Sequence, residues 1–312
     1  MKILIELPTW LGDCVMATPA IENIVNFNND VEITFIGSFI AIEALKNHPK
    51  VVKTVVLDKK YRVLYKIARN LGEFDYFFSF RSSLRTKFLK FLISANNKYQ
   101  FDKNKYINCH QVKKYNDFVN TSLNINSNPG RLKLYKHNQS LELAQKPILG
   151  INPGASYGSA KRWYPEEFAK VASELSGQYD IVIFGGPGEV DIALDIEKSL
   201  LEKGVKNYKN LAGKTTIPEL MSRISNLDLF ITGDSGPMHV AAAFQVPTVA
   251  IFGPTKDGET SQWMNEKSLI VKKNLDCQPC MKRTCPLRHH NCMKLINASD
   301  ILEVIPEMLY TV

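Results

Sequence analysis

The stretch NLDLFITGDSGPMHVAAAF, residues 226–244, joins an apolar run to a helical pattern through a short turn. We expect a buried strand from Asn226 to Thr232 and a helix from Met238 to Phe244. At a helix start the first backbone N–H groups lack intrahelical partners and carry the positive end of the helix dipole. The two glycines of the turn would let a phosphate approach this backbone. The turn therefore predicts either a diphosphate site or an ordinary helix start capped by Asp234 or Ser235.

Short apolar runs alternate with helical patterns along the whole chain. The expected strands are Lys2–Leu7, Val31–Ile36, Val51–Leu57, Phe74–Phe80, Ile148–Asn152, Ile181–Phe184, Leu227–Thr232 and Thr248–Phe252. The expected helices include Val15–Phe27, Ala41–Lys46, Leu64–Leu71, Pro165–Ser176, Val190–Glu202, Pro218–Ser225 and Asp300–Leu309. This βαβ rhythm predicts an α/β fold in which parallel sheets carry helices on both faces.

Two domains are expected, because a chain of 312 residues can bury two cores. A polar stretch, Asn124–Pro129, and a weakly patterned one, Lys136–Pro147, indicate a linker. We place the domains at residues 1–145 and 146–312, with the last helix either in the second domain or packed back on the first. In such folds ligands bind at the carboxyl ends of the strands, in the cleft between the domains.

Charge is divided unevenly between the two halves of the chain. The net charge is +8, but residues 1–147 carry 22 Lys and Arg against 12 Asp and Glu, whereas residues 148–312 carry 17 against 19. The basic first half favours an anionic partner: a nucleic acid, a membrane surface, or a phosphorylated or carboxylated substrate. A solvated, lysine-rich surface without such a partner explains the same excess.

Two classes of protein are disfavoured by the sequence. No apolar run approaches the roughly 18 residues needed to span a bilayer, so we expect a cytoplasmic protein. Neither half carries G-x-G-x-x-G after its first strand, which argues against a nicotinamide-dependent dehydrogenase.

Asp13 closes the first predicted strand-to-helix turn, Pro8-Thr9-Trp10-Leu11-Gly12-Asp13. A carboxylate at a helix start commonly interacts with the positive end of the helix. A carboxylate that faces a nucleotide-sugar site could instead act as a general base. The local sequence leaves both roles open.

Three loops of the second half follow strands and carry groups suited to a nucleotide diphosphate. The first runs from Asn152 to Lys161, the second from Phe184 to Glu189 and the third from Asp234 to His239. Glycines allow close approach, Lys161 would neutralise phosphate charge, and a carboxylate can accept hydrogen bonds from ribose. The candidate donor-binding residues are Gly154, Ser156, Gly186, Glu189, Asp234, Ser235, Gly236 and His239.

Several motifs together resemble those of the bacterial ADP-heptose:lipopolysaccharide heptosyltransferases, glycosyltransferase family 9. They are Leu11-Gly12-Asp13, Asn152-Pro153-Gly154, Ala160-Lys161-Arg162-Trp163, Asn210-Leu211-Ala212-Gly213-Lys214-Thr215, Asp234 to Ala243, and Phe252-Gly253-Pro254-Thr255. The tail from Cys277 to Cys292 resembles the heptosyltransferase II branch. The resemblance covers nearly the whole chain and is strongest in the second half.

This resemblance implies the GT-B architecture, in which two Rossmann-like βαβ domains face each other across a cleft. The first domain would bind the acceptor and the second the ADP-heptose donor. The implied reaction inverts the anomeric centre, needs no cofactor, and moves L-glycero-D-manno-heptose to the first heptose of the lipopolysaccharide inner core of a Gram-negative cell.

The resemblance also implies roles for individual residues. Asp13 would be the base that deprotonates the acceptor hydroxyl, and Lys161 would hold the donor phosphates. Glu189 would bind the ribose. Asp234, Ser235, Gly236 and His239 would line the diphosphate and heptose region.

The acceptor would be acidic, since the inner core bears carboxylates and lipid phosphates. We therefore name Arg62, Arg81 and Arg85 as candidate acceptor contacts, because guanidinium pairs bidentately with such anions. A lipid-linked acceptor also predicts peripheral contact with the cytoplasmic face of the inner membrane. The sequence departs from the family at Pro237 and in the stretch Phe80–Arg85.

Four of the six cysteines, Cys277, Cys280, Cys285 and Cys292, are spaced as C-x2-C-x4-C-x6-C. This spacing is compact enough for a structural tetrahedral zinc site, and a packed loop of thiols explains it equally.

Two other functions are compatible with the sequence. One is a related transferase with another sugar or acceptor, such as heptosyltransferase I. The other is a basic nucleic-acid-binding protein with a four-cysteine zinc module, which is disfavoured because the basic excess lies in the opposite half from the cysteines.

Overall fold

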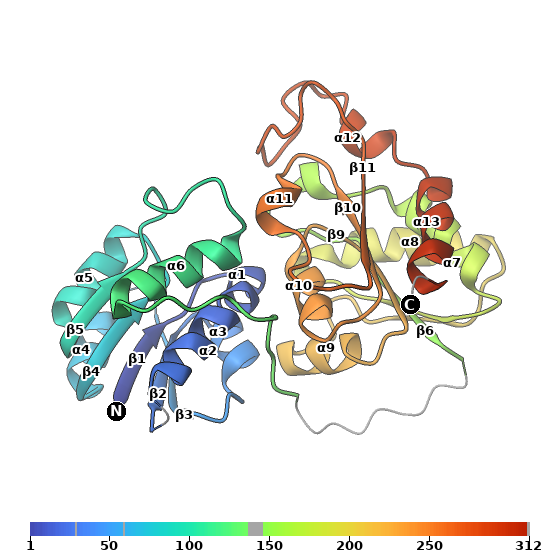
Figure 1. Cartoon of the computed structure of the whole chain (residues 1–312). Coiled ribbons are helices and arrows are strands. Elements are labelled where there is room, and N and C mark those ends of the chain that lie inside the picture. The colour runs from blue at the N-terminus through green and yellow to red at the C-terminus, as the bar shows by residue number, and fades with distance from the viewer. Residues whose placement is uncertain (29, 59, 137–145, 311–312) are drawn as a thin grey trace. The chain divides into compact units, whose positions relative to one another are not determined.

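The computed structural model describes residues 1–28, 30–58, 60–136 and 146–310. The chain divides into two compact units, of which the first ends at Lys136. Figure 1 shows both units, each an α/β assembly built on one parallel sheet. The predicted boundary at residue 145 and most of the second predicted linker stretch lie outside the described residues. The predicted α/β class is confirmed.

The first unit contains a five-stranded parallel sheet in the order β3-β2-β1-β4-β5. Its strands are β1 (Lys2–Glu6), β2 (Glu32–Gly37), β3 (Val51–Val56), β4 (Glu73–Ser79) and β5 (Ser94–Gln100). The chain leaves β1 to one side for β2 and β3, then returns to the other side for β4. Ligands of open parallel sheets bind outside the carboxyl ends of the strands at such a reversal. In this unit the reversal lies between β1 and β4.

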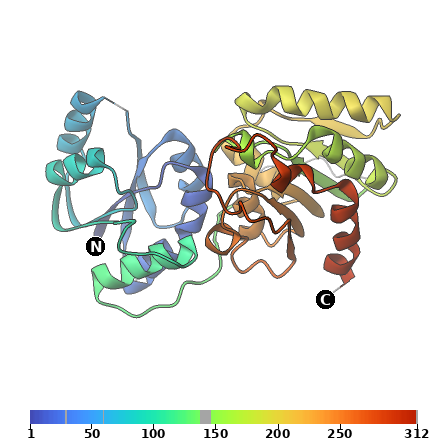
Figure 2. The same ribbon diagram turned by 90° about the horizontal axis from the view of Figure 1, so that it is seen from above.

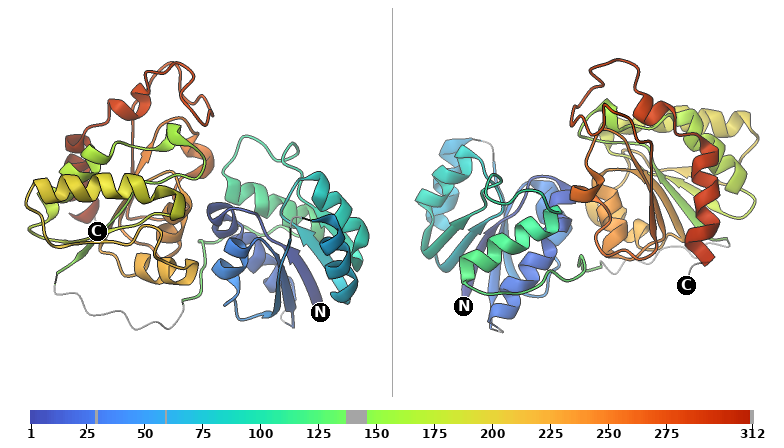
Figure 3. Two further views of the ribbon diagram at one scale, coloured as in Figure 1. Left: turned by 180° about the vertical axis from the view of Figure 1, so that it is seen from behind. Right: turned by 45° about the horizontal axis from the view of Figure 1, so that its top comes forward.

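Helices cover both faces of this sheet, as Figures 2 and 3 show. They are α1 (Leu11–Met16), α2 (Thr18–Phe27), α3 (Phe39–Leu45), α4 (Tyr61–Asn70), α5 (Leu84–Leu92) and α6 (Gln111–Leu123). Alternate side chains of β4 face opposite layers. Phe77 packs in a core cluster with Leu64 of α4 and Leu89 of α5, whereas Phe78 contacts Phe118 of α6.

The single helix predicted from Val15 to Phe27 is wrong in one respect, because the structure contains two helices, α1 and α2. Ala17 lies between them, and Pro19 occupies the first turn of α2. Proline lacks a backbone N–H, so it is well tolerated at a helix start and poorly tolerated inside a helix.

The second unit contains a six-stranded parallel sheet in the order β11-β10-β9-β6-β7-β8. Its strands are β6 (Ile148–Asn152), β7 (Asp180–Ile183), β8 (Tyr208–Asn210), β9 (Leu229–Gly233), β10 (Thr248–Phe252) and β11 (Ser268–Lys272). Here the chain order reverses between β6 and β9. The carboxyl ends of these two strands therefore predict the ligand site of this unit.

The helices of the second unit are α7 (Pro165–Leu175), α8 (Val190–Glu202), α9 (Ile217–Ile224), α10 (Gly236–Ala243), α11 (Asp257–Thr260), α12 (Asn291–Lys294) and α13 (Ala298–Tyr310). Val249 and Ile251 of β10 face the core beneath α7 and α8, whereas Ala250 and Phe252 pack with Met238 of α10. The last helix, α13, packs against α7 and β11 of its own unit. Within the described part of the chain, no helix is both long enough and apolar enough to cross a membrane.

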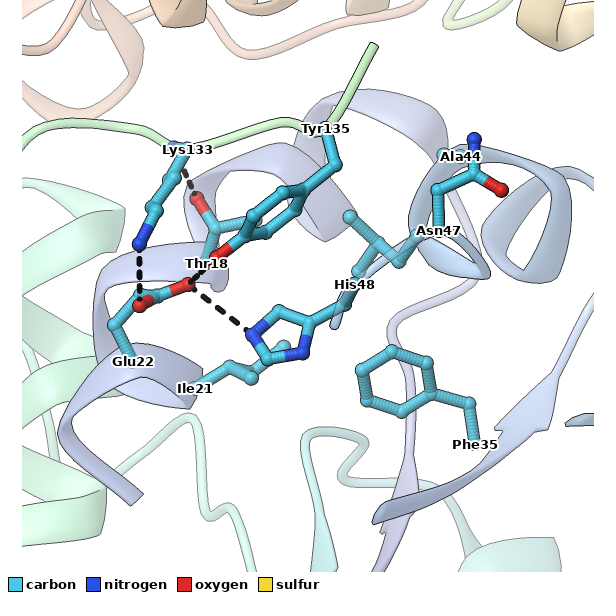
Figure 4. Close-up of a pocket in the computed structure, with 10 residues that line it drawn as sticks. Thr18, Ile21, Glu22, Phe35, Ala44, Asn47, His48, Lys133 and Tyr135 are labelled. Carbon is cyan, nitrogen blue, oxygen red and sulfur yellow. Dashed lines mark hydrogen bonds and ion pairs between the residues drawn. The ribbon is translucent and has the colours of Figure 1, made fainter. Parts of the chain in front are cut away.

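A cluster of polar side chains fixes the segment that leaves the first unit (Figure 4). The Glu22 carboxylate accepts hydrogen bonds from the Lys133 ammonium at 2.9 Å and the Tyr135 hydroxyl at 3.0 Å, and lies 3.2 Å from Nε2 of His48. The His48 ring accepts a hydrogen bond from the Lys50 backbone N–H at Nδ1. Burial raises the pKa of Glu22, but its hydrogen bonds with His48, Lys133 and Tyr135 and the Lys133 charge outweigh burial and lower this pKa to about 2.

This cluster predicts how stability depends on pH. Because the folded pKa of Glu22 lies below its usual value of 4.5, its contribution is present above that pH and is lost as the pH falls towards 2. We expect Glu22→Gln to lower the free energy of unfolding at pH 7 by about 2 kcal/mol, with the deficit shrinking as the pH falls. Urea denaturation at a series of pH values measures this.

Glu43→Gln is the matched control, since Glu43 is about as exposed as Glu22 and, among the described residues, its ion pair is with Lys46, three residues along the chain. That variant should change the free energy of unfolding by less than about 0.5 kcal/mol. A Glu22→Gln deficit that is small, or equally large at acid pH, would contradict the assigned role of the carboxylate.

Candidate active site

The reversal between β6 and β9 is held together by the side chain of Asn152, the last residue of β6. Its Nδ2 donates to the Ser235 hydroxyl at 3.2 Å, the Gly154 carbonyl at 3.3 Å and the Thr232 hydroxyl at 3.4 Å. One buried amide thus connects the loop after β6 to the end of β9 and the start of α10. Two of the three loops predicted to hold a nucleotide meet here.

The start of α10 is open at its first turn. Ser235 is the N-cap residue by backbone conformation, but its side chain makes no capping hydrogen bond. The Ser235 hydroxyl instead accepts a hydrogen bond from the side-chain amide of Asn152 and lies 3.2 Å from the Thr232 hydroxyl. Of the two residues predicted as N-cap, Ser235 holds that position, but the side-chain hydrogen bond expected of a cap is not formed. The side chains of Asp234 and Ser235 therefore do not cap the first backbone N–H groups of α10, which carry the positive end of the helix dipole.

Lys161 and Asp234 form a largely buried ion pair beside this helix start. Lys161 Nζ lies 2.5 Å from Asp234 Oδ2, and the Thr255 hydroxyl donates to the same oxygen at 2.6 Å. Nζ also lies 4.7 Å from the centre of the Tyr157 ring, within reach of a cation–π interaction. The Oδ2 atom of Asp234 thus contacts both the ammonium and the Thr255 hydroxyl. Asp234 acts as a positioning group for Lys161.

The second predicted loop brings the Glu189 carboxylate against the first. Its Oε2 accepts a hydrogen bond from the Gly186 N–H at 2.7 Å. A Cβ built on Gly154 would lie 2.0 Å from the Glu189 carboxyl carbon, so only glycine leaves room for this approach. Gly154, Gly186 and Glu189 are therefore brought together, as the sequence predicts.

The remaining donor-side candidates differ in exposure. Ser156 is exposed in the loop after β6, Gly236 is the first residue of α10, and His239 is buried one turn into that helix. All the donor-binding candidates lie in the loops that follow β6, β7 and β9 or in the first turn of α10, at the carboxyl edge of the sheet.

The reversal between β1 and β4 in the first unit buries another carboxylate. Glu6 accepts hydrogen bonds from the Ser79 hydroxyl at 2.7 Å, the Thr86 hydroxyl at 3.4 Å and Nη1 of Arg81 at 3.4 Å. Burial raises the pKa of Glu6, and the hydrogen bond from Ser79 and the charge of Arg81 oppose this rise. Arg81, a predicted acceptor contact, is therefore anchored by a carboxylate that the sequence patterns did not single out.

Asp13 lies in the first turn of α1, directly after β1. The neighbouring Cys14 is fully buried, and burial and the Asp13 charge raise its thiol pKa, whereas the Arg81 charge opposes the rise. Burial and Asp13 likewise raise the pKa of Tyr115 on α6. Asp13 and Arg81 follow β1 and β4, which pair in parallel, so these two predicted residues lie at the same edge of the sheet.

The other two predicted arginines lie farther out in the loops of this edge. Arg85, on α5, donates from Nη2 to the Asp58 carbonyl in the loop after β3. Arg62 is exposed in the first turn of α4. Arg81 thus lies in the loop after β4, whereas Arg62 and Arg85 lie in the first turns of the helices that follow β3 and β4.

Cys277, Cys280, Cys285 and Cys292 line one small cavity of the second unit, together with His289 and His290. Among the residues that the structure describes, no group of three or more His, Cys, Asp or Glu side chains is arranged to hold a metal ion. Burial and the three other cysteines raise the pKa of Cys292 to about 11. The zinc hypothesis receives no support from this arrangement, and both it and the alternative of packed thiols stay predictions.

A family model described as glycosyltransferase family 9 (heptosyltransferase) matches residues 79–291. The chain belongs to glycosyltransferase family 9. Within this family, the lipooligosaccharide heptosyltransferase 2 of Campylobacter jejuni subsp. jejuni serotype O:2 is 45% identical over 316 residues, covering 99% of this chain and 98% of the relative. This likeness confirms the resemblance to the heptosyltransferase II branch. It sets aside the interpretation as a nucleic-acid-binding protein.

Solved structures of family 9 members share the fold. The E. coli ADP-heptose lps heptosyltransferase II matches with a TM-score of 0.82 at 20% identity, over 99% of this chain and 98% of that chain. An E. coli heptosyltransferase with ADP matches with a TM-score of 0.79 at 14% identity, over 99% and 100%. These likenesses confirm the predicted GT-B architecture of two Rossmann-like domains.

Three residues that contact the candidate site residues escaped the sequence analysis as individual candidates. Asn152 and Thr255 lie inside quoted motifs, and only their hydrogen bonds to Ser235 and Asp234 reveal their roles. Glu6 ends a strand and reads as an ordinary strand residue. A charged residue at the inner end of an apolar strand is the signal that could have found it.

The Lys161–Asp234 pair predicts a stability effect. Asp234→Ala leaves a largely buried ammonium without its carboxylate, and we expect the free energy of unfolding to fall by about 3 kcal/mol. Adding Lys161→Met should restore part of this loss. Glu219→Ala, which breaks the surface pair with Arg223 on α9, is the control and should cost less than about 1 kcal/mol. Urea denaturation measures these free energies of unfolding. Equal losses in Asp234→Ala and Glu219→Ala would argue against a coupled buried pair.

Proposed function

We propose that this protein is an inverting heptosyltransferase that moves L-glycero-D-manno-heptose from ADP-heptose to the first heptose of the lipopolysaccharide inner core. The observation that carries the proposal is the full-length likeness to a lipooligosaccharide heptosyltransferase 2. The two edge sites support it, since one offers groups for a nucleoside diphosphate and the other a carboxylate and arginines.

The donor is bound by the second unit. The diphosphate contacts the Lys161 ammonium and the first amides of α10, which together stabilise the charge that develops on departing ADP. Asp234 and Thr255 hold the ammonium in place. Glu189 accepts hydrogen bonds from the ribose hydroxyls, next to Gly154 and Gly186.

The remaining donor-side candidates contact the phosphates and the heptose. Ser156 and Ser235 donate hydroxyl hydrogen bonds, and Gly236 contributes a backbone N–H at the helix start. His239 lies beneath this surface in α10 and supports the heptose region.

The acceptor is bound by the first unit. Arg62, Arg81 and Arg85 contact its carboxylates and phosphates, which accounts for the basic excess of the first half. Asp13 removes the proton of the acceptor hydroxyl as that oxygen attacks the anomeric carbon from the side opposite ADP. The single displacement inverts the anomeric centre.

No metal or cofactor is needed for this reaction. A cation that neutralises the diphosphate is already supplied by Lys161, and the helix dipole of α10 adds to it. The leaving group therefore finds positive charge from the chain itself.

The lipid-linked acceptor places the reaction at the cytoplasmic face of the inner membrane. The enzyme would bind there peripherally, while its active site meets a headgroup that carries negative charge.

Transfer by the purified full chain tests the proposed function. With ADP-heptose and an inner-core acceptor that carries one heptose, we expect mass spectrometry to find a product heavier by one heptose, with or without EDTA. Transfer only to an acceptor that lacks heptose would instead assign the heptosyltransferase I reaction. Activity abolished by EDTA and restored by added metal would overturn the metal-free mechanism.

The donor site predicts the effect of removing the ammonium. Lys161→Ala should weaken ADP binding by about 1.5–3 kcal/mol, the range for a hydrogen bond to a charged group. Lys170→Ala, an exposed lysine of α7, is the control and should leave the affinity unchanged. Titration calorimetry measures both, and an unchanged affinity in Lys161→Ala would remove this residue from the site.

The acceptor site predicts the effect of removing the base. Asp13→Asn keeps the shape and most of the capping ability, so folding and ADP affinity should survive. Turnover should fall by roughly 10² to 10⁴-fold, because general-base catalysis is lost. Asp117→Asn, an exposed residue of α6, is the control. An Asp13→Asn enzyme that keeps more than about a tenth of wild-type turnover would show that another group is the base.

A further inference from the structure

Helices α4 and α5 lie side by side over one face of the first sheet. Their inner sides are apolar and contribute Leu64, Ala68, Leu89 and Ile93, at or just beyond the helices, to a common core cluster. An ordinary surface helix would expose polar side chains opposite this buried stripe. Both helices depart from that pattern.

The outer side of α5 is apolar at helical spacing. Leu84, Lys87, Phe88 and Phe91 follow the i, i+3, i+4, i+7 pattern of one helix face, and all four are exposed. Leu84 is 78% exposed and Phe91 is 81% exposed. Folding of the chain therefore leaves two large apolar side chains almost entirely in water.

Helix α4 extends this face. Tyr61 and Tyr65 are exposed one turn apart on its outer side, and the Tyr61 ring meets the Phe88 ring edge to face with centres 5.3 Å apart. We call this surface the aromatic face: Tyr61, Tyr65, Leu84, Phe88 and Phe91. An apolar surface that spans two neighbouring helices is typical of a binding region.

The charged side chains of the two helices that carry the aromatic face have one sign. Helices α4 and α5 carry six cations and no carboxylate: Arg62, Lys66, Arg69, Arg85, Lys87 and Lys90. Helix α8 of the second unit provides a contrast, since its exposed Leu194 and Leu201 lie among four carboxylates and one lysine. Among these three described helices, only α4 and α5 combine exposed apolar side chains with positive charge that no carboxylate of the same helix opposes.

We propose that the aromatic face is the surface by which this protein binds a bilayer of anionic phospholipid. The apolar side chains would enter the boundary between headgroups and acyl chains, where tyrosine rings also lie favourably. The lysines and arginines would meet the negative headgroups, with their aliphatic stems along the apolar surface. A solvated nucleic acid would give Leu84 and Phe91 no apolar environment, so the lipid surface fits the whole set better.

The position of this surface in the fold suits a lipid-linked substrate. Helices α4 and α5 follow the carboxyl ends of β3 and β4, and Arg85 links α5 to the loop after β3. The proposed acceptor contacts thus come from the same two helices and their preceding loops. The inference deepens the proposed function, because it names the surface and the lipid chemistry of the membrane contact.

Co-sedimentation of the purified full chain with vesicles tests the proposal. We expect binding to vesicles of phosphatidylglycerol and phosphatidylcholine, and at least tenfold weaker binding to phosphatidylcholine alone. Leu84→Ser with Phe91→Ser should reduce the partition coefficient on the anionic vesicles at least tenfold. Lys87→Glu with Lys90→Glu should do the same and should weaken the dependence on salt concentration.

The matched control is Leu194→Ser with Leu201→Ser, which removes two exposed leucines from the acidic surface of α8. This variant should bind anionic vesicles as the wild type does. All variants should keep the wild-type melting temperature, because the replaced side chains are exposed or, for Lys90, half-buried. Wild-type chain that ignores anionic vesicles, or an unchanged partition in the Leu84 and Phe91 variant, would overturn the proposal.

Two further outcomes assign the aromatic face to another partner and overturn the lipid proposal. One is a dimer in ultracentrifugation that Leu84→Ser with Phe91→Ser abolishes, without vesicle binding. The other is binding of single-stranded RNA that the same variant abolishes, again without vesicle binding.

Transfer assays separate this inference from the proposed function. The Leu84 and Phe91 variant should transfer heptose to a deacylated acceptor in solution as fast as the wild type, and should be slower on acceptor embedded in vesicles. Normal transfer without vesicle binding rejects the membrane surface alone. Vesicle binding without any transfer rejects the proposed function alone.

Discussion

Parallel pairing of every strand is the constraint on which both sites depend. A parallel sheet gathers the carboxyl ends of its strands at one edge, and the reversal of strand order opens that edge at one point. In the first unit this point lies between β1 and β4, and in the second between β6 and β9. Every candidate catalytic or donor-binding residue follows a strand at such an edge. The fold therefore specifies where chemistry is possible before any side chain is considered.

The two edges solve the same electrostatic problem in similar ways. Each buries a carboxylate, Glu6 in one unit and Asp234 in the other, and each satisfies it with hydroxyl groups and one cation. A buried carboxylate is costly unless it is paired and hydrogen-bonded. Once satisfied, it holds its cation in a fixed direction. Arg81 and Lys161 are thus oriented before any ligand arrives, which reduces the entropy lost on binding.

The sequence patterns predicted the central strands of both described sheets but only one of their four edge strands, β3. The strands β5, β8 and β11 went unpredicted, and all three are edge strands. The sequence of β5, SANNKYQ, is polar because one side of an edge strand faces water. This strand therefore lacks the apolar run that marks a central strand. Helix α5 was missed because its apolar residues fall on both its inner and outer sides. In the sites, whole motifs were predictable, whereas the pairing of Asn152, Thr255 and Glu6 depends on contacts between distant segments.

The residue that follows Asn152 has a consequence for the chemical lifetime of the protein. Asparagine side chains in proteins deamidate when the next backbone nitrogen attacks the amide carbon and closes a succinimide ring. Here the next residue is Pro153, whose ring nitrogen carries no hydrogen, so this route is blocked. Deamidation would replace three donated hydrogen bonds by a negative charge beside the diphosphate region. The proline thus protects the amide that joins β6, β9 and α10 against ageing.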